Sequence, residues 1–172
     1  MSEPLRFVTP GPAHAGAVAA FIQAFNRRGE AEINGSCGLT ELPYPQWLAH
    51  LERVSRGLAP GWMPARVHWA FLPGDPVPAA ILEVRCPITP AEYHNGHIGL
   101  SVRPDRRRRH LGSALVAWAE EQLLAQGQHW VLITCDEWND PSRRMIEHCG
   151  YRFFQRYTDA QGDAILLYQK KI

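Results

Sequence analysis

The chain has 172 residues, of which 45% are hydrophobic and 20% are charged, and its formal net charge is +1 at pH 7. This composition is typical of a globular protein and excludes an intrinsically disordered chain. The small net charge provides no global field that would favour nucleic acid or an anionic membrane surface, and the apolar runs are too short to span a bilayer. The length fits one domain, which we place at residues 1–172.

The first half of the chain predicts a strand, two helices and two further strands. In chain order we expect a strand at residues 5–9, a helix with an apolar stripe from Ala17 to Phe25, a loop at 29–43, a helix with a stripe from Trp47 to Val54, and strands at 67–72 and 77–85. The helices are indicated by apolar residues that recur every three or four positions. Pro73-Gly74-Asp75-Pro76 is a strong turn signal between the two strands.

The second half predicts alternating strands and helices. We expect a loop at residues 86–95, a strand at 96–103, a long helix from about Arg109 to Ala125, a strand at 130–135, a helix from Asp140 to about Cys149, and strands at 151–157 and 164–169. The almost entirely apolar run at 130–135 is typical of a strand that is covered on both faces. Asp140 followed by Pro141 predicts a helix start with Asp as the N-cap.

The segment from Leu100 to Ser113 combines a strand end, an arginine-rich turn and a helix start. The free N–H groups in the first turn of a helix, with its positive dipole end, form an anion site. Arginine side chains in the preceding turn add charge-assisted hydrogen bonds that suit phosphate. The segment therefore predicts that a phosphate-bearing ligand is held between the strand end and the helix start.

Within this segment, Val102-x-Pro104-x-x-Arg107-x-x-His110-x-Gly112 resembles the acyl-CoA signature of the GNAT superfamily, V-x-P-x-x-(Q/R)-x-x-G-x-(G/A). In that family the turn and helix-start amides hold the CoA pyrophosphate, and the preceding strand offers its backbone to the pantetheine. The resemblance implies that the cofactor-binding residues include Leu100, Ser101, Val102, Arg107, Arg108, Arg109, His110, Leu111, Gly112 and Ser113.

A second segment, Asn139-Asp-Pro-Ser142-Arg-Arg-Met-Ile146-Glu-His-Cys-Gly150-Tyr151, resembles the family's second signature. The resemblance implies that Asn139 and Ser142 contact the pantetheine or CoA. Residues 96–104, together with Thr134-Cys-Asp136, are similar to a bacterial branch known only as predicted acetyltransferases. The implied fold is α/β, with a mixed, mostly antiparallel central sheet that is split near the CoA-binding strand, helices on both faces, and the order β-α-α-β-β-β-α-β-α-β-β.

The resemblance implies an N-acetyltransferase that uses acetyl-CoA, or another acyl-CoA, as co-substrate and requires no metal. We expect a neutral primary amine to attack the thioester directly in a ternary complex, with a backbone N–H of residues 100–102 stabilising the oxyanion. An amine with a pKa of about 10 is mostly protonated at pH 7, so a base must remove its proton. His97 and Glu83 are the candidate bases, directly or through water.

Two positions depart from the family pattern. His110 replaces the first glycine of the loop, and we expect it to fit because a residue that enters a right-handed helix has a negative φ. Ile146 stands where many GNAT enzymes carry a tyrosine acid, and it cannot donate a proton. The missing acid leaves an alternative function open, a non-catalytic acyl-CoA-binding sensor or regulatory module.

Alternative interpretations of the candidate residues also remain. Arg106 to Arg109 fit a solvated turn or a nucleic-acid patch, and His94 with His97 suggests a metal pair, although no cysteine or carboxylate cluster accompanies it. The alternative for Glu83 is an edge or surface carboxylate. The alternatives for His97 and Asn139 are a hydrogen-bonded structural histidine and a plain turn asparagine.

The motifs do not name the acceptor, which we expect to be a small-molecule or peptide amine. Its specificity is expected in residues 29–64 and 86–95, with Tyr44, Trp47 and Trp62 as candidate cleft residues. We expect no nucleic-acid or membrane partner, and a monomer or homodimer. The absence of a CxxC pair and of a secretory segment predicts a cytoplasmic protein with free thiols at Cys37, Cys86, Cys135 and Cys149.

Overall fold

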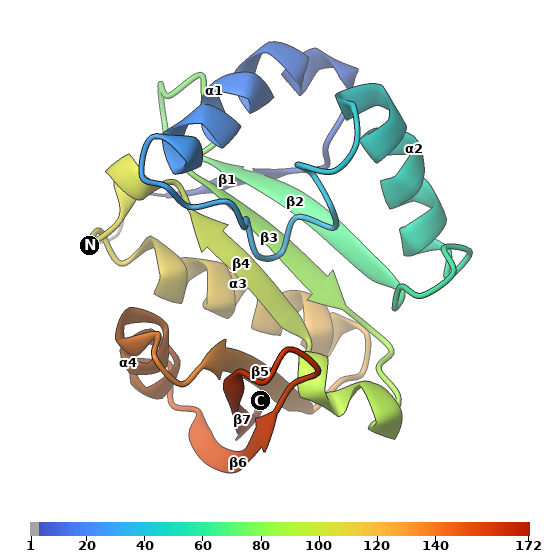
Figure 1. The fold of residues 1–172 in the computed structure, drawn as a ribbon, viewed down its shortest axis with the longest axis vertical. Helices are drawn as coiled ribbons and strands as arrows, with labels where there is room; N and C mark the ends of the chain where they lie inside the picture. Colours follow the sequence, from blue (N-terminus) through green and yellow to red (C-terminus); the bar gives the residue numbers. More distant parts are fainter. Residues whose placement is uncertain (1–3) are drawn as a thin grey trace.

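The computed structural model describes residues 4–172 and shows one seven-stranded sheet with helices packed against it (Figure 1). The elements are β1 (Arg6–Val8), η1 (Pro12–His14), α1 (Ala15–Asn26), α2 (Tyr44–Ser55), β2 (Ala65–Phe71), β3 (Ala80–Arg85), η2 (Pro90–Asn95), β4 (Ile98–Val102), η3 (Pro104–Arg106), α3 (Leu111–Ala125), β5 (Trp130–Asp136), α4 (Asp140–His148), β6 (Arg152–Thr158) and β7 (Ala164–Lys171). The order of strands and α-helices agrees with the predicted order. The elements labelled η are short 3-10 turns.

The sheet is antiparallel except at its centre. Its strand order is β1-β2-β3-β4-β5-β7-β6, and only β4 and β5 run parallel among these described strands. The register of β4 and β5 contains the single pair Ile98 and Ile133, whereas β5 pairs with β7 along its whole length. The expectation of a mostly antiparallel sheet that is split beside β4 is therefore confirmed.

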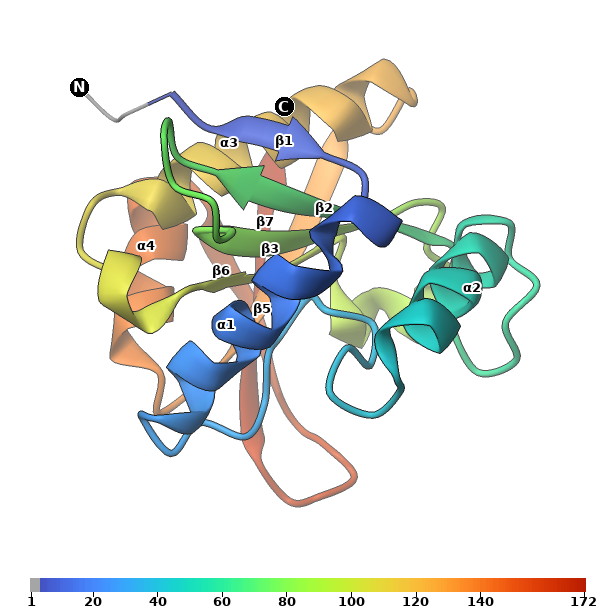
Figure 2. The same cartoon turned by 90° about the horizontal axis from the view of Figure 1, so that it is seen from above.

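The helices divide between the two faces of the sheet, so that each face has its own core (Figure 2). Helices α1 and α2 cover one face, where Phe21, Trp47 and Trp69 are fully buried. Helices α3 and α4 cover the other face, where Leu115 and Ile146 are fully buried. The helical spacing of apolar residues in the sequence predicted the buried stripes of α1 and α2 correctly.

Two helix boundaries differ from the expected ones. Helix α3 begins at Leu111 rather than near Arg109, because His110 has the left-handed conformation and acts as the N-cap. Helix α4 begins at Asp140, but its N-cap is Asn139 rather than Asp140. The carboxamide oxygen of Asn139 accepts a hydrogen bond from the Ser142 N–H at 3.2 Å, which satisfies one of the free N–H groups of the first turn.

The four cysteines are free thiols. Within residues 4–172, no helix is both long and apolar enough to cross a membrane. The same residues contain no group of three or more His, Cys, Asp or Glu side chains arranged to hold a metal ion.

Candidate active site

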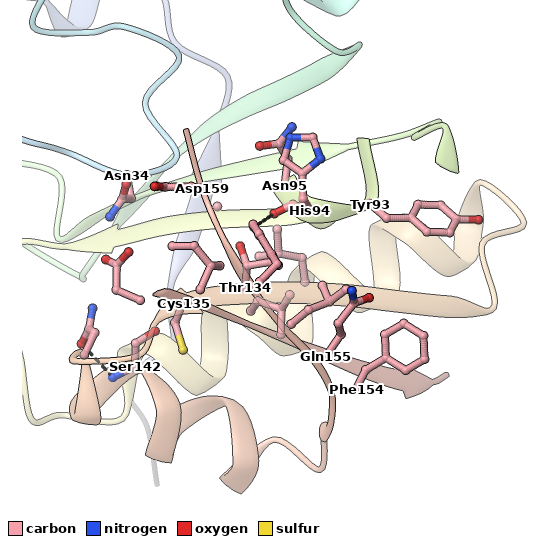
Figure 3. Close-up of a pocket in the computed structure, with 18 of the residues that line it drawn as sticks. Asn34, Tyr93, His94, Asn95, Thr134, Cys135, Ser142, Phe154, Gln155 and Asp159 are labelled. Atoms are coloured by element: carbon pink, nitrogen blue, oxygen red, sulfur yellow. Dashed lines mark hydrogen bonds between the residues drawn. The ribbon is translucent and has the colours of Figure 1, made fainter. Parts of the chain in front are cut away.

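A cleft of about 910 Å³ opens where β4 and β5 separate (Figure 3). Its walls come from β4, β5, the start of α4, η2, the loop after α1, and the hairpin of β6 and β7. In Figure 3, Asn34 and Asp159 lie toward one side of the cleft, and Tyr93 and Phe154 lie toward the other. The cleft therefore joins a polar, acidic region to an aromatic one.

The two strands are held together at one end of β4, and this contact fixes where they separate. The His97 N–H donates to the Leu132 carbonyl at 2.8 Å, and the Leu132 N–H donates to Nδ1 of His97 at 3.0 Å. Gly96 permits this approach, because a Cβ at that position would lie 2.9 Å from the Leu132 oxygen. The register of β4 and β5 extends no further than Ile98, so the cleft begins there.

The backbone of Leu100 faces the cleft, as the hydrogen-bond pattern of β3 and β4 shows. The Arg85 N–H donates to the His97 carbonyl, and the Arg103 N–H donates to the Ala79 carbonyl. Bonding alternates along an antiparallel pair, so the odd-numbered residues of β4 bond to β3 and the even-numbered residues point the other way. The N–H and C=O of Leu100 therefore point toward the gap left by β5.

The turn before α3 has the shape of an anion site. Arg108 and His110 have φ values of 60° and 58°, and the N-cap residue provides no side-chain cap to the first turn. The expectation that His110 has a negative φ is wrong, because its backbone retains the left-handed conformation that glycine adopts most easily. Gly112 has a different role: a Cβ there would lie 3.2 Å from Cγ of Met145, so glycine allows α3 to approach α4.

The arginines of this turn have different environments. Arg106 bonds to Asp75 and Asp105, and Arg107 forms a bidentate ion pair with Glu30. Within residues 4–172, Arg108 has no carboxylate partner. Arg108 is therefore better placed than Arg107 to meet a phosphate. The side chain of Leu111 is buried, so only its backbone can contact a ligand.

The geometry of His97 argues against its expected role as the base. Its side chain is 2% exposed, and burial lowers the pKa of His97 to about 4. Nδ1 accepts the bond from the Leu132 N–H, so a neutral ring carries its proton on Nε2, which is buried and has no hydrogen-bond partner within the described residues. The lone pair that a base requires is already used to join β4 to β5.

Glu83 is also buried rather than at an edge or on the surface, with 4% of its area exposed. One carboxylate oxygen accepts a hydrogen bond from Sγ of Cys37 at 3.1 Å, and the other pairs with Arg85 at 2.6 Å. Arg85 in turn donates to the carbonyls of Asn95 and Gly96. Glu83 thus anchors the loop that contains Cys37 and, through Arg85, the end of η2 at Asn95 and Gly96. It does not line the cleft itself.

The start of α4 brings the second signature to the cleft. Asn139 and Ser142 both line it, and the Asn139 NH₂ group remains able to donate because its oxygen alone caps the helix. Cys135 on β5 lies in the same wall, and burial raises the pKa of its thiol to about 11. Ile146 is fully buried in the core of this face.

Two carboxylates of the cleft were not among the predicted residues. Asp136 ends β5, and Asp159 follows β6; both line the cleft. Burial raises the pKa of Asp136, and the negative charges of Asp163, Glu32 and Asp159 raise it further. The Thr134-Cys-Asp136 triplet marked this strand end in the sequence, whereas nothing marked Asp159.

The predicted acceptor residues of α2 do not reach the cleft. Trp47 is fully buried and donates its indole N–H to the Ser36 carbonyl, and the Tyr44 hydroxyl donates to the Gly11 carbonyl. The cleft wall comes instead from Asn34 with Gly35, from η2, and from the β6–β7 hairpin. Of residues 29–64, Asn34 and Gly35 line the cleft, and the contribution of the hairpin to the cleft wall was not predicted.

Comparisons with known proteins agree with this arrangement. A family model described as the Acetyltransferase (GNAT) family matches residues 63–151, which include β4, the turn before α3, and α4. Among curated proteins, none matches the chain at a significant level.

Solved structures share the fold at low sequence identity. The ribosomal-protein-S5-alanine acetyltransferase from Vibrio fischeri is 14% identical, with a TM-score of 0.74 over 99% of this chain and 94% of that chain. An acetyltransferase from Salmonella typhimurium that modifies the N-terminal serine of ribosomal protein L7/L12 is 13% identical. Its TM-score is 0.72, over 98% of this chain and 95% of that chain. The putative acetyltransferase yncA from Salmonella typhimurium, solved with acetyl-CoA, is 13% identical. Its TM-score is 0.65, over 97% of this chain and 93% of that chain.

Proposed function

Since the chain belongs to the acetyltransferase (GNAT) family, we propose that it transfers an acetyl group from acetyl-CoA to the primary amine of a peptide or protein, by direct attack in a ternary complex. The observation that carries this proposal is the separation of β4 from β5 beside an uncapped helix start. The separation provides a cleft for the pantetheine, and the helix start provides amides for the phosphates.

The residues present fit acetyl-CoA along the whole path. The amides of residues 108–113 and the Arg108 side chain would hold the phosphates, and the pantetheine would lie along β4 between Leu100 and the Asn139 NH₂ group. Acetyl-CoA supplies a thioester, whose carbonyl carbon is the electrophile. The Leu100 N–H, which faces the cleft, is the donor best placed to stabilise the oxyanion.

The amine nitrogen attacks the thioester carbon, and the C–S bond then breaks to release the CoA thiolate. The proton of the incoming ammonium passes to Asp136, directly or through water, because this carboxylate lines the cleft and has a raised pKa. Asp159 adds negative charge that attracts the cationic form of the amine. The thiolate leaves without the usual tyrosine acid, which fits Ile146 at that position, because a thiol with a pKa of about 8.5 is a tolerable leaving group without full protonation.

The preference for a polypeptide amine is supported by two observations. Solved proteins of the same fold acetylate ribosomal proteins, one of them at an N-terminal serine. The cleft of this chain also has exposed aromatic side chains at its mouth, Tyr93 and Phe154, which suit contact with a peptide.

The test is the release of free thiol from acetyl-CoA in the presence of three kinds of acceptor. These are peptides with a free N-terminal serine or alanine, the same peptides with a blocked N-terminus and an internal lysine, and a polyamine. We expect release with the first group, a matching acetylated product by mass spectrometry, and a loss of about 10²-fold or more in kcat/KM for Asp136→Asn. No thiol release with any amine would refute the proposed activity, and release with the polyamine alone would refute the peptide acceptor.

A further inference from the structure

Each nitrogen of the Arg107 guanidinium already has a protein partner. Nη1 and Nη2 donate to the two carboxylate oxygens of Glu30, at 2.8 and 2.6 Å, and Nε donates to the Val102 carbonyl at 3.1 Å. The guanidinium carbon also lies 5.7 Å from the centre of the Phe25 ring, within the range of a cation–π contact. These bonds use three of the five guanidinium N–H groups, and Glu30 balances the positive charge of the side chain, so a phosphate can bind Arg107 strongly only by competing with Glu30.

These contacts join three parts of the chain around the turn before α3. Val102 ends β4, Phe25 lies in the last turn of α1, and Glu30 follows α1. The Glu30 N–H donates to the Phe25 carbonyl at 3.1 Å, so Glu30 is itself fixed to the end of α1. The ion pair therefore connects the turn to the end of α1, and the Nε bond connects it to the end of β4.

The turn requires such anchors because its backbone is strained. Arg108 and His110 both adopt the left-handed conformation, which is unfavourable for a residue with a side chain. Strained residues of this kind persist only where the surrounding structure holds them in place.

We propose that Arg107 and Glu30 are positioning residues, whose ion pair holds the amides of residues 108–112 in the geometry that binds the CoA phosphates. Arg107 then acts through the turn and does not bind phosphate itself. The inference rests on the proposed use of acetyl-CoA.

The same contact reaches the other side of the cleft. The segment that starts at Glu30 continues to Gly35, which packs directly on β4: a Cβ at Gly35 would lie 2.3 Å from the Gly99 oxygen. Gly99 precedes Leu100, whose N–H faces the cleft. When CoA phosphates fix the turn, the ion pair therefore also restrains the cleft wall at Asn34 and Gly35.

Glu30→Gln distinguishes positioning from direct binding, because the two roles predict opposite results in calorimetric titration with CoA. If Arg107 positions the turn, Glu30→Gln weakens CoA binding on the order of fivefold. This change in Kd corresponds to about 1 kcal/mol, the upper end of what an exposed ion pair contributes. Arg107→Ala weakens binding at least as much, and the double variant is no worse than Arg107→Ala. If Arg107 binds phosphate, Glu30→Gln frees it, so that CoA binding is unchanged or tighter; that result overturns the inference.

The control is Glu52→Gln, which breaks an exposed ion pair with Arg56 on α2 and is expected to leave CoA affinity unchanged. Thermal melts confirm that each variant is folded. Hydrogen exchange tests whether the ion pair restrains the cleft wall when CoA binds. CoA should slow exchange at residues 31–36 in the wild type and much less in Glu30→Gln. Equal protection in the two proteins overturns this link between the turn and the cleft wall. If the wild type does not bind CoA, the proposed function is refuted. If the wild type and Glu30→Gln bind CoA equally well, only the role of the ion pair is refuted.

Discussion

Replacing Glu83 with glutamine separates two roles that the sequence could not distinguish, proton acceptor and structural anchor. Gln keeps one oxygen, which can accept from Arg85 or from Cys37 but not from both, and it removes the negative charge beside Arg85, whose side chain is only 16% exposed. A hydrogen bond to a charged group contributes about 1.5–3 kcal/mol. We therefore expect Glu83→Gln to lower the free energy of unfolding by about 2 kcal/mol, which corresponds to a fall of roughly 4–8 °C in Tm for a chain of this size.

The matched variant is Glu83→Gln combined with Arg85→Met, which removes the buried charge together with its partner. Leaving one charge of a buried pair without its partner costs more than removing both charges, so the double variant should recover part of the lost stability. The activity readout is the pH–rate profile of kcat/KM. If Glu83 only anchors these segments, the pH–rate profile of Glu83→Gln keeps its shape. In that case kcat/KM falls modestly, because the cleft wall shifts when its anchor is weakened.

The opposite pattern would refute this reasoning. A general base that is lost costs about 10²- to 10⁴-fold in rate and removes the corresponding limb of the pH profile. If Glu83→Gln melts like the wild type while kcat/KM falls by that amount and the limb disappears, Glu83 is the base and the burial argument is wrong.

Three further predictions concern the cofactor, His97 and the turn. Acetyl-CoA at a hundredfold excess over its Kd should add about 2.7 kcal/mol of stability, and a thermal melt that does not move with acetyl-CoA or CoA would exclude the cofactor. Because burial lowers the pKa of His97 from 6.5 to about 4, the unfolded chain binds more protons between these values. Stability should therefore fall as the pH falls, by about 2 kcal/mol from this group at pH 5; denaturant melts at pH 7 and 5 should show the fall in the wild type and a smaller one in His97→Gln. His110→Gly should raise stability by up to about 1 kcal/mol in denaturant melts by relieving the left-handed conformation, whereas Ser113→Gly, at a helical position, should lower it by a similar amount.

The order of elements could be predicted because each one carries its own periodic signal. The stripe of α1, the apolar run of β5 and the Pro-Gly turn between β2 and β3 depend on neighbouring residues alone, and all three were predicted. Element ends were less certain, since a cap depends on single hydrogen bonds. Asn139 rather than Asp140 caps α4 because its carboxamide oxygen reaches the Ser142 N–H, a choice that composition does not reveal.

The turn before α3 and the α4 start could be located from motifs, but the partners of individual side chains could not. Arg107 was predicted to contact the cofactor because it lies in an arginine run, whereas its ion pair with Glu30, 77 positions away in the sequence, could not be predicted. The same limit applies to Glu83, whose burial depends on Cys37 from a loop that has no period. The strands of the β6–β7 hairpin were predicted, but the places of Asp159 and of the hairpin in the cleft wall were not, because they depend on where the hairpin lies and not on any local pattern.

The left-handed residues of the turn show what the glycine of the family signature supplies. Glycine at that position provides a backbone shape at little cost, and this chain reaches the same shape with His110 and Arg108. The strain must then be offset by contacts elsewhere, and the Glu30 ion pair and the Val102 bond are contacts that can offset it. It follows that the departure at His110 and the pairing of Arg107 with Glu30 are linked. A variant with glycine at residue 110 should depend less on Glu30 for CoA binding than the wild type does, because its turn no longer requires the same support.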